Sequence, residues 1–135
     1  MFDSVNTKSR DELNEISGKI IDGAIRVHKE LGPGMLEGAY QTCLMNELVE
    51  AGYSVRSQLK LPIVYRGITL DAGYRIDLLM HDSVIVELKA IEKLLPVHEA
   101  QLLSYLRMSN LRLGLLVNFN VKRLVDGVRR VVNNF

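Results

Sequence analysis

With 135 residues, of which 47% are hydrophobic, the chain is long and apolar enough to bury the core of one compact domain, which excludes a disordered protein. Its formal net charge of +1 excludes a bulk polycation, and no apolar run reaches the length of a membrane span. The single cysteine, Cys43, excludes an internal disulfide or a cysteine-based zinc site and suits a reducing cytoplasm. We expect residues 1–135 to form a single domain, with residues 1–8 as a flexible N-terminus.

Two helices are predicted in the first part of the chain. Apolar residues recur at every third or fourth position across residues 9–31, and Gly32-Pro33-Gly34 follows as a stop signal. A second helical pattern runs over about residues 36–51 and is followed by Gly52, a residue that suits the end of a helix.

Strand-like segments come next. Residues 53–65 and 68–80 predict two strands separated by a turn at Arg66-Gly67, with Pro62 indicating an edge or a bulge in the first and a bend near Gly73 in the second. A short turn then leads into a third strand over residues 84–91, so that the three strands form a meander.

The remaining third predicts a helix followed by two strands. Pro96 suits the first turn of a helix of about thirteen residues, and residues 111–118 form an apolar run typical of a buried strand. A short helical or irregular piece near residues 121–125 and a strand near 127–133 complete the chain. The order of elements predicts one α/β domain with a mixed central sheet flanked by helices.

The most informative segment is the heptapeptide VIVELKA, residues 84–90. Glu87 and Lys89 are two residues apart on an apolar strand, so both side chains project from the same face. Asp77 interrupts the apolar run of the preceding strand. Charged groups are rarely buried unless they are paired or bind a metal, so acids on two adjacent strands indicate a divalent-metal site for phosphodiester chemistry. A structural Glu–Lys pair at a strand end is the alternative.

Polar residues on the two flanking helices extend this candidate site. Gln101 and Tyr105 are four residues apart on the third helix, and His98 precedes Gln101 by three, so the three side chains share a helix face. Glu37 and Tyr40 share a face at the start of the second helix. Each of these residues also has an ordinary structural interpretation: a solvated face, a capping histidine, a first-turn acid and a core tyrosine.

These residues together resemble a known family. Gly34-x-x-Glu37-x-x-Tyr40 resembles the signature of the small bacterial GxxExxY proteins, which are placed in the PD-(D/E)xK nuclease-like superfamily. Asp77, Glu87-Leu88-Lys89 and Gln101-x-x-x-Tyr105 match the acid, E-x-K and RecB-like Q-x-x-x-Y motifs of that superfamily in order. Ile76 stands where the superfamily name has a proline. The resemblance covers roughly residues 10–133.

The resemblance implies a restriction-endonuclease-like fold and a role for each motif residue. Asp77, Glu87 and the backbone carbonyl of Leu88 would bind Mg²⁺ or Mn²⁺, with Glu37 as a third acid, and Lys89 would be the catalytic lysine alongside Asp77 and Glu87. The remaining polar residues would contact nucleic acid, and these are Gln101, Tyr105, Tyr40 and His98.

The expected function is therefore a metal-dependent nuclease that acts on DNA in preference to RNA. Six basic residues against one acid from Arg107 onward favour a polyanionic partner, although a solvated surface explains them equally well. The alternative is a binding module that keeps the nuclease fold and acts through nucleic acid or a protein partner without turnover. A homodimer that pairs through an edge strand near residues 127–133 is also open, although Arg129 and Arg130 there oppose edge pairing.

Overall fold

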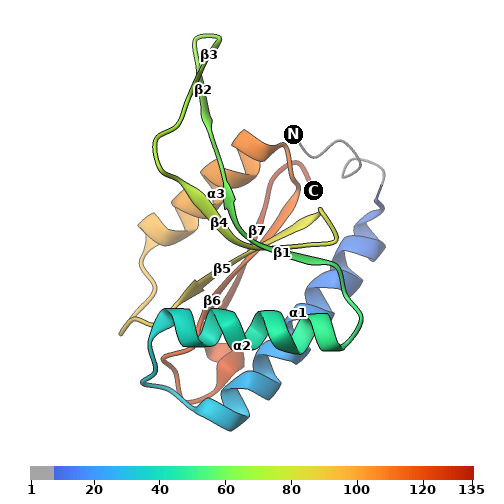
Figure 1. Ribbon diagram of the computed structural model, residues 1–135, viewed down its shortest axis with the longest axis vertical. Helices are drawn as coiled ribbons and strands as arrows, with labels where there is room; N and C mark the ends of the chain where they lie inside the picture. The colour runs from blue at the N-terminus through green and yellow to red at the C-terminus, as the bar shows by residue number, and fades with distance from the viewer. Residues whose placement is uncertain (1–7) are drawn as a thin grey trace.

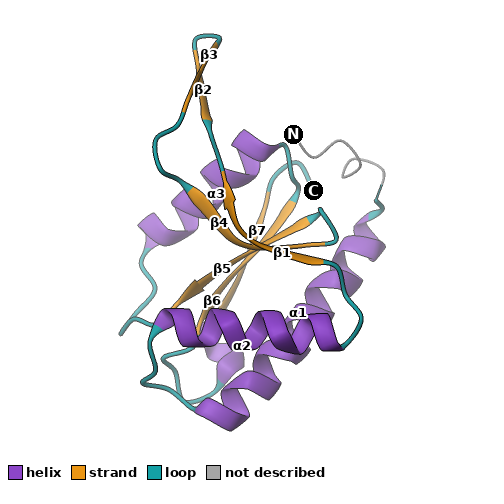
Figure 2. Cartoon of the chain, in the orientation of Figure 1, coloured by secondary structure: helices purple, strands orange, loops and turns teal. Residues whose placement is uncertain are grey.

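The computed structural model describes residues 8–135, which fold into a mixed five-stranded sheet with helices on both faces and a separate two-stranded hairpin (Figures 1 and 2). The expected flexible N-terminus, residues 1–8, lies outside the described residues except for Lys8. The elements in chain order are α1 (Arg10–Leu31), α2 (Glu37–Glu50), β1 (Val55–Lys60), β2 (Ile63–Tyr65), β3 (Ile68–Leu70), β4 (Arg75–Met80), β5 (Val84–Lys89), α3 (Pro96–Ser109), β6 (Leu113–Asn118), the 3₁₀ helix η2 (Leu124–Gly127) and β7 (Val128–Val132).

The central sheet has the strand order β1-β4-β5-β6-β7. Strands β1, β4 and β5 form an antiparallel meander, and α3 then crosses over so that β6 pairs in parallel with β5. Strand β7 closes the other edge by antiparallel pairing with β6. This arrangement confirms the predicted α/β domain with a mixed sheet, and every predicted helix and strand of the meander is present.

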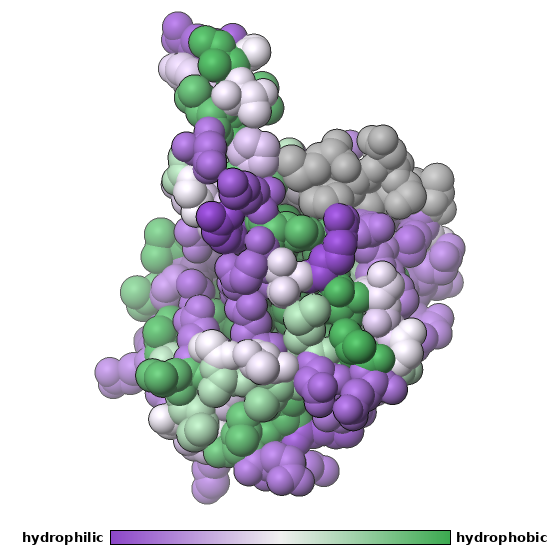
Figure 3. Space-filling model, in the orientation of Figure 1, coloured by the Kyte–Doolittle hydropathy of each residue, from purple (hydrophilic) through white to green (hydrophobic). Residues whose placement is uncertain are grey.

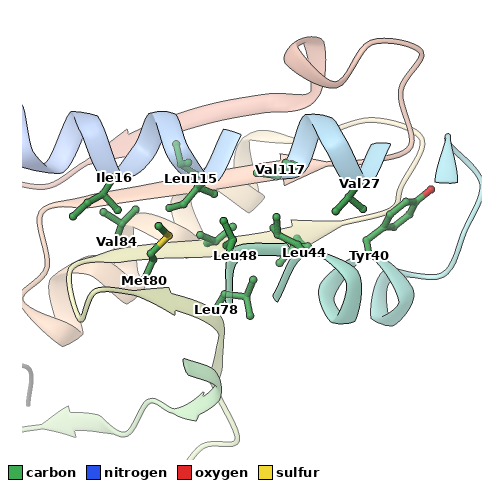
Figure 4. Close-up of a cluster of buried hydrophobic side chains, with 14 of the residues drawn as sticks. Ile16, Val27, Tyr40, Leu44, Leu48, Leu78, Met80, Val84, Leu115 and Val117 are labelled. Atoms are coloured by element: carbon green, nitrogen blue, oxygen red, sulfur yellow. The ribbon is translucent and has the colours of Figure 1, made fainter. Parts of the chain in front are cut away.

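Helices α1 and α2 cover one face of the sheet. Ser9 caps α1 by accepting a hydrogen bond from the backbone N–H of Glu12, while the Glu12 side chain accepts one from the N–H of Ser9. The apolar stripes of both helices meet alternate residues of β4, β5 and β6 in the larger core (Figure 4). On β5 these are Val84, Val86 and Leu88, so Glu87 and Lys89 face the opposite side of the sheet.

Helix α3 covers that opposite side. Its Leu102 and Leu106 pack with Ile76, Leu79 and Ile85 in a second, smaller core. The helix approaches β6 closely because Gly114 has no side chain: a Cβ there would lie 2.9 Å from a methyl carbon of Leu102. The sheet is therefore sandwiched, and charged side chains of β5 lie beside α3.

The segment between β1 and β4 differs from its prediction. The two long strands expected over 53–65 and 68–80 are each broken, near Pro62 and near Gly73. Pro62 has no N–H to donate to a ladder, and Gly73 adopts φ +81°, so neither continues a regular strand. Residues 61–74, which we call the arm, form the β2–β3 hairpin with the expected Arg66-Gly67 turn and project away from the sheet (Figure 1).

Within residues 8–135, no helix combines the length and the apolar character that a bilayer crossing requires. Cys43 is half-buried and packs against the larger core, in agreement with its interpretation as a small apolar residue.

Candidate active site

Asp77 and Glu87 face each other where β4 and β5 stop pairing as a regular ladder. The last regular pair joins Leu78 to Val86, which places Asp77 opposite Glu87 one step further. The N–H of Asp77 donates to Oε1 of Glu87 at 3.1 Å, and the N–H of Leu88 donates to Oδ2 of Asp77 at 2.9 Å. The two carboxylates thus replace backbone acceptors between the strands, and each has a second oxygen that is not used for a backbone N–H.

Burial makes the Glu87 carboxyl a much weaker acid than an exposed glutamate. Its side chain is only 8% exposed, and desolvation raises its pKa to about 9, assisted by the charge of Asp77 and by a hydrogen bond from the protonated carboxyl to Asp77. The N–H of Asp77 and the charge of Lys89 oppose this shift without cancelling it. The Glu87 carboxyl of the metal-free protein therefore keeps its proton at neutral pH.

Lys89 and Glu37 lie beside this pair. Lys89 follows Glu87 by two residues on the same face of β5, as expected, and it is half-buried. Glu37 is the first residue of α2 and interacts electrostatically with Lys89 and Asp77. Partial burial of the carboxyl raises the pKa of Glu37, Lys89 lowers it and Asp77 raises it, with a net upward shift. The beginning of α2 therefore brings a third acid toward the ends of β4 and β5.

The position of Glu37 depends on Tyr40, which the structure places inside the core. Tyr40 is completely buried and stacks on Phe119 with ring centroids 4.5 Å apart. Its hydroxyl donates to the carbonyl oxygen of Gly32 at 2.5 Å and accepts from the N–H of Met35 at 3.1 Å. Tyr40 therefore holds the turn that precedes α2, and the expectation that it contacts nucleic acid is corrected because it exposes no surface.

The other two residues of the GxxExxY signature are explained by the same turn. Gly34 adopts φ +96°, a conformation that side chains disfavour. The N-cap residue of α2, Leu36, offers no side-chain hydrogen bond, so the turn is held by Tyr40 instead. The motif thus combines a turn, the acid at the first helical position and the tyrosine that anchors both.

On α3, Tyr105 is the residue that interacts electrostatically with the carboxylates. Tyr105 is buried against the smaller core, and its pKa is raised to about 12 by burial and by the charges of Glu87 and Asp77. Its hydroxyl is therefore a protonated donor near the acids. Gln101, one turn earlier, is exposed. His98 instead accepts a hydrogen bond from the N–H of Leu95 at 2.9 Å through Nδ1, which is the capping role left open for it.

Gln58 of β1 is a neighbour of the site that the sequence did not single out. It lies opposite Asp77, yet the ladder skips this pair while joining the residues on either side. Gln58 adopts φ +51°, which is strained for a residue with a side chain, and its Nε2 donates to Oε1 of Gln41 at 2.9 Å. Gln41 is one turn after Glu37 on α2, so this bond links α2 to the strand beside Asp77.

A second missed residue is Asn118, the last residue of β6 and the partner of Lys89 in the parallel ladder. Its Oδ1 accepts from the N–H of Ile91 at 3.1 Å and from the N–H of Asn120 at 3.2 Å, and its Nδ2 donates to the carbonyl of Ile91 at 2.9 Å. The buried amide therefore fixes the loop that leaves β5 immediately after Lys89. A polar residue ending an apolar run, LGLLVN, was the available sequence signal.

The donor set fits a hard divalent cation at the Asp77–Glu87 pair. Mg²⁺ often takes only one or two protein carboxylates and keeps several waters. A cation bound beside Glu87 would also offset the free-energy cost of ionising its buried carboxyl. Within the described residues 8–135, no three histidine, cysteine or acidic side chains converge into a metal-binding group. The geometry therefore offers a two-carboxylate site, with Glu37 near it but outside the pair.

Comparison with known proteins agrees with this arrangement. The family model described as PD-(D/E)XK nuclease superfamily matches residues 14–131, which include Glu37, both strand acids, Lys89 and α3. The chain belongs to this superfamily. No curated protein and no solved structure gave a significant match. Membership in the superfamily confirms the predicted restriction-endonuclease-like domain and a nuclease-like function, and the narrower likeness to GxxExxY proteins stays a prediction.

Proposed function

We propose that this protein is a metal-dependent nuclease that hydrolyses phosphodiester bonds, with DNA favoured over RNA. The observation that carries the proposal is the buried Asp77–Glu87 pair, where the two carboxylates cross between strands and Lys89 projects beside them. A purely structural pair has no need to keep two acids together at a site where one of them remains protonated at neutral pH.

Each residue has a defined role in this proposal. Asp77, Glu87 and the Leu88 carbonyl would hold Mg²⁺ or Mn²⁺, with Glu37 as a further acid. A bound divalent ion supplies positive charge to the phosphate and lowers the pKa of a water. Lys89 orients the attacking water or stabilises charge that develops on the phosphate. Gln101 and the protonated Tyr105 donate hydrogen bonds to phosphate oxygens.

The test is cleavage of end-labelled DNA and RNA with Mg²⁺ or Mn²⁺, with EDTA as the metal-free condition. We expect cleavage in the native protein and none in Asp77→Asn or Lys89→Ala. Lys29→Ala, which removes an exposed lysine of α1, is the matched control and retains full activity. Undiminished cleavage by Lys89→Ala would refute the assignment.

A binding module without turnover is the second candidate, because no three acidic, histidine or cysteine side chains of the described residues form a metal-binding group. It would bind nucleic acid or a protein partner through the same surface. Metal binding by calorimetry separates the candidates, since a nuclease binds Mg²⁺ or Mn²⁺ and loses that binding in Glu87→Gln. We also propose a homodimer that pairs through β7. The free thiol of Cys43 favours a cytoplasmic location, because the cytoplasm is reducing.

A further inference from the structure

The arm exposes apolar surface that the fold of the domain does not explain. Among the described residues, β2 and β3 pair only with each other. Val64 is 67% exposed and Ile68 60%, and Tyr65 and Leu70 are also exposed. Figure 3 shows hydrophobic surface on the projecting arm, interspersed with hydrophilic surface. An isolated two-stranded hairpin is marginally stable in water, so this surface indicates contact with a ligand.

A cavity of about 420 Å³ lies between the base of the arm and α3. Ile63 and Tyr74 line it from the arm, and Gln101, Tyr105 and Met108 line it from the helix. Its walls are mainly apolar, with few polar groups, and its volume is within the range of small-molecule sites. The rings of Tyr74 and Tyr105 meet edge to face with centroids 5.8 Å apart.

This cavity adjoins the candidate active site through Tyr105. Tyr105 lines the cavity and also interacts electrostatically with Glu87 and Asp77, and Gln101 lies one turn from it on the same wall. Tyr74 precedes Asp77 by three residues in the chain. A nucleotide whose phosphate lies at the two acids therefore has an aromatic, apolar cavity next to it.

The charge of the arm and of the adjoining helix favours a nucleic acid over an apolar peptide or a second copy of the chain. The segment from 60 to 75 carries Lys60, Arg66 and Arg75 against the single acid Asp71. Arg107 of α3 lines an adjoining hollow with Val64 and Met108. Aromatic side chains beside positive charges are the pattern that binds single-stranded nucleic acid, because an unpaired base can stack while the charges neutralise the backbone.

We propose that this cavity binds an unpaired nucleobase of the strand whose phosphodiester lies at Asp77 and Glu87. The inference rests on the proposed function and deepens it: the substrate is single-stranded or locally unpaired nucleic acid, such as a flap, bulge or flipped nucleotide. In an intact duplex the faces of the bases are stacked and unavailable, so a fully paired substrate gains nothing from the cavity.

The experiment measures binding without cleavage. The full chain carrying Lys89→Ala is titrated in EDTA with oligonucleotides that contain 2-aminopurine, whose fluorescence is quenched by stacking. Single-stranded DNA, single-stranded RNA, the matched duplex and a duplex with one bulged 2-aminopurine are compared. We expect quenching and tight binding with either single strand and with the bulge, and weak binding with the duplex.

Three variants in the same background assign the effect to the cavity. Tyr74→Ala is expected to weaken single-strand binding roughly 5- to 100-fold, the range of one base stacked on an aromatic ring, while duplex binding stays unchanged. Tyr74→Phe restores binding. Ala100→Leu fills the cavity from an exposed helix position without removing a contact, and it gives the same loss even if Tyr74→Ala perturbs the arm. Val49→Ala, at an exposed apolar position of α2 that does not line the cavity, is the control and keeps the quenching.

The outcomes separate this inference from the proposed function. Tyr74-dependent quenching in a protein that cleaves no substrate supports the cavity and refutes the nuclease. Cleavage of intact duplex and single strand at equal rates, unaffected by Tyr74→Ala, overturns the cavity and keeps the nuclease. A native dimer that becomes monomeric in Tyr74→Ala and binds no single strand also overturns it, because a second copy then occupies the cavity.

Discussion

Replacing Glu87 by glutamine is expected to stabilise the metal-free protein, and to do so more strongly as pH rises. The folded-state pKa of Glu87, about 9, is well above its ordinary value of 4.5 because burial and Asp77 disfavour the charge. Between these two values the folded protein keeps a proton that the unfolded chain releases. The contribution of the Glu87 carboxyl to the stability of the native protein is therefore fully present below about pH 4.5 and is lost progressively as pH rises toward 9.

The magnitude follows from the width of that window. Each pH unit within it costs about 1.4 kcal/mol, so the native protein loses about 3 kcal/mol between pH 5 and pH 7 through Glu87 alone. The amide introduced by Glu87→Gln has no proton to lose, and its oxygen can still accept from the N–H of Asp77. All other titrating groups are shared, so the stability difference between variant and native protein isolates this carboxyl.

The assay is urea denaturation of both proteins in EDTA at about pH 5 and about pH 7. The advantage of Glu87→Gln is expected to grow by about 3 kcal/mol over this interval. Glu92→Gln, which changes an exposed carboxylate of the following loop, is the matched control and shows no such growth. If the unfolding free energies of the native protein and of Glu87→Gln change equally with pH, the reasoning is refuted, because Glu87 is then ionised in the folded protein at no cost. Added Mg²⁺ is expected to narrow the difference between the two proteins at pH 7, because the ion stabilises only the native protein.

Three further predictions follow from the surroundings of the carboxylate pair. Mg²⁺ or Mn²⁺ at a hundredfold excess over its dissociation constant should stabilise the native protein by about 2.7 kcal/mol and raise its melting temperature, but should leave the melting temperature of Asp77→Asn unchanged. Equal shifts of melting temperature in the two proteins would mean that the ion binds elsewhere. Tyr40→Phe should lower the unfolding free energy by about 1–2 kcal/mol and reduce cleavage, because the turn before Glu37 loses both hydrogen bonds of the hydroxyl. Urea unfolding measures the first effect and initial cleavage rates measure the second. Unchanged values of both would contradict the anchoring role of Tyr40. Asn118→Ala should cost about 2–3 kcal/mol, since it leaves the N–H groups of Ile91 and Asn120, in the loops after β5 and β6, without their acceptor. Asn133→Ala, which removes another side-chain bond to a backbone carbonyl at the far end of the sheet, is the comparison and should retain normal cleavage.

The sequence predicted the architecture well because its signals are local. The apolar periods of residues 9–31 and 96–108, the stop at Gly32-Pro33-Gly34 and the apolar run of VIVELKA each correspond to one element of the fold. The order of those elements then leaves few ways to build a sheet, and the parallel β5–β6 pair with α3 as its crossover is the common solution. The acids of β4 and β5 were predictable for the same reason, as charges that interrupt buried strands.

What escaped prediction depends on contacts between distant residues. A strand pattern continues through Pro62 and Gly73, and only their backbone conformations turn that stretch into a projecting arm. No residue near Gln58 in the chain predicts that the ladder skips the Gln58–Asp77 pair, because the register of two strands determines it. Tyr40 was ambiguous between core and interface, since its partner Phe119 lies 79 residues away in the sequence.

The arm is inserted between two strands that are themselves paired, which makes it a replaceable module. Its base is closed by the N–H of Leu61, which donates to the carbonyl of Tyr74 at 2.9 Å and continues the β1–β4 ladder. Residues between these two can be lengthened, shortened or exchanged without altering the pairing that positions Asp77. If the proposed function holds, substrate choice and hydrolysis are encoded in separable parts of the chain, and exchange of the arm changes specificity while the acids stay in place.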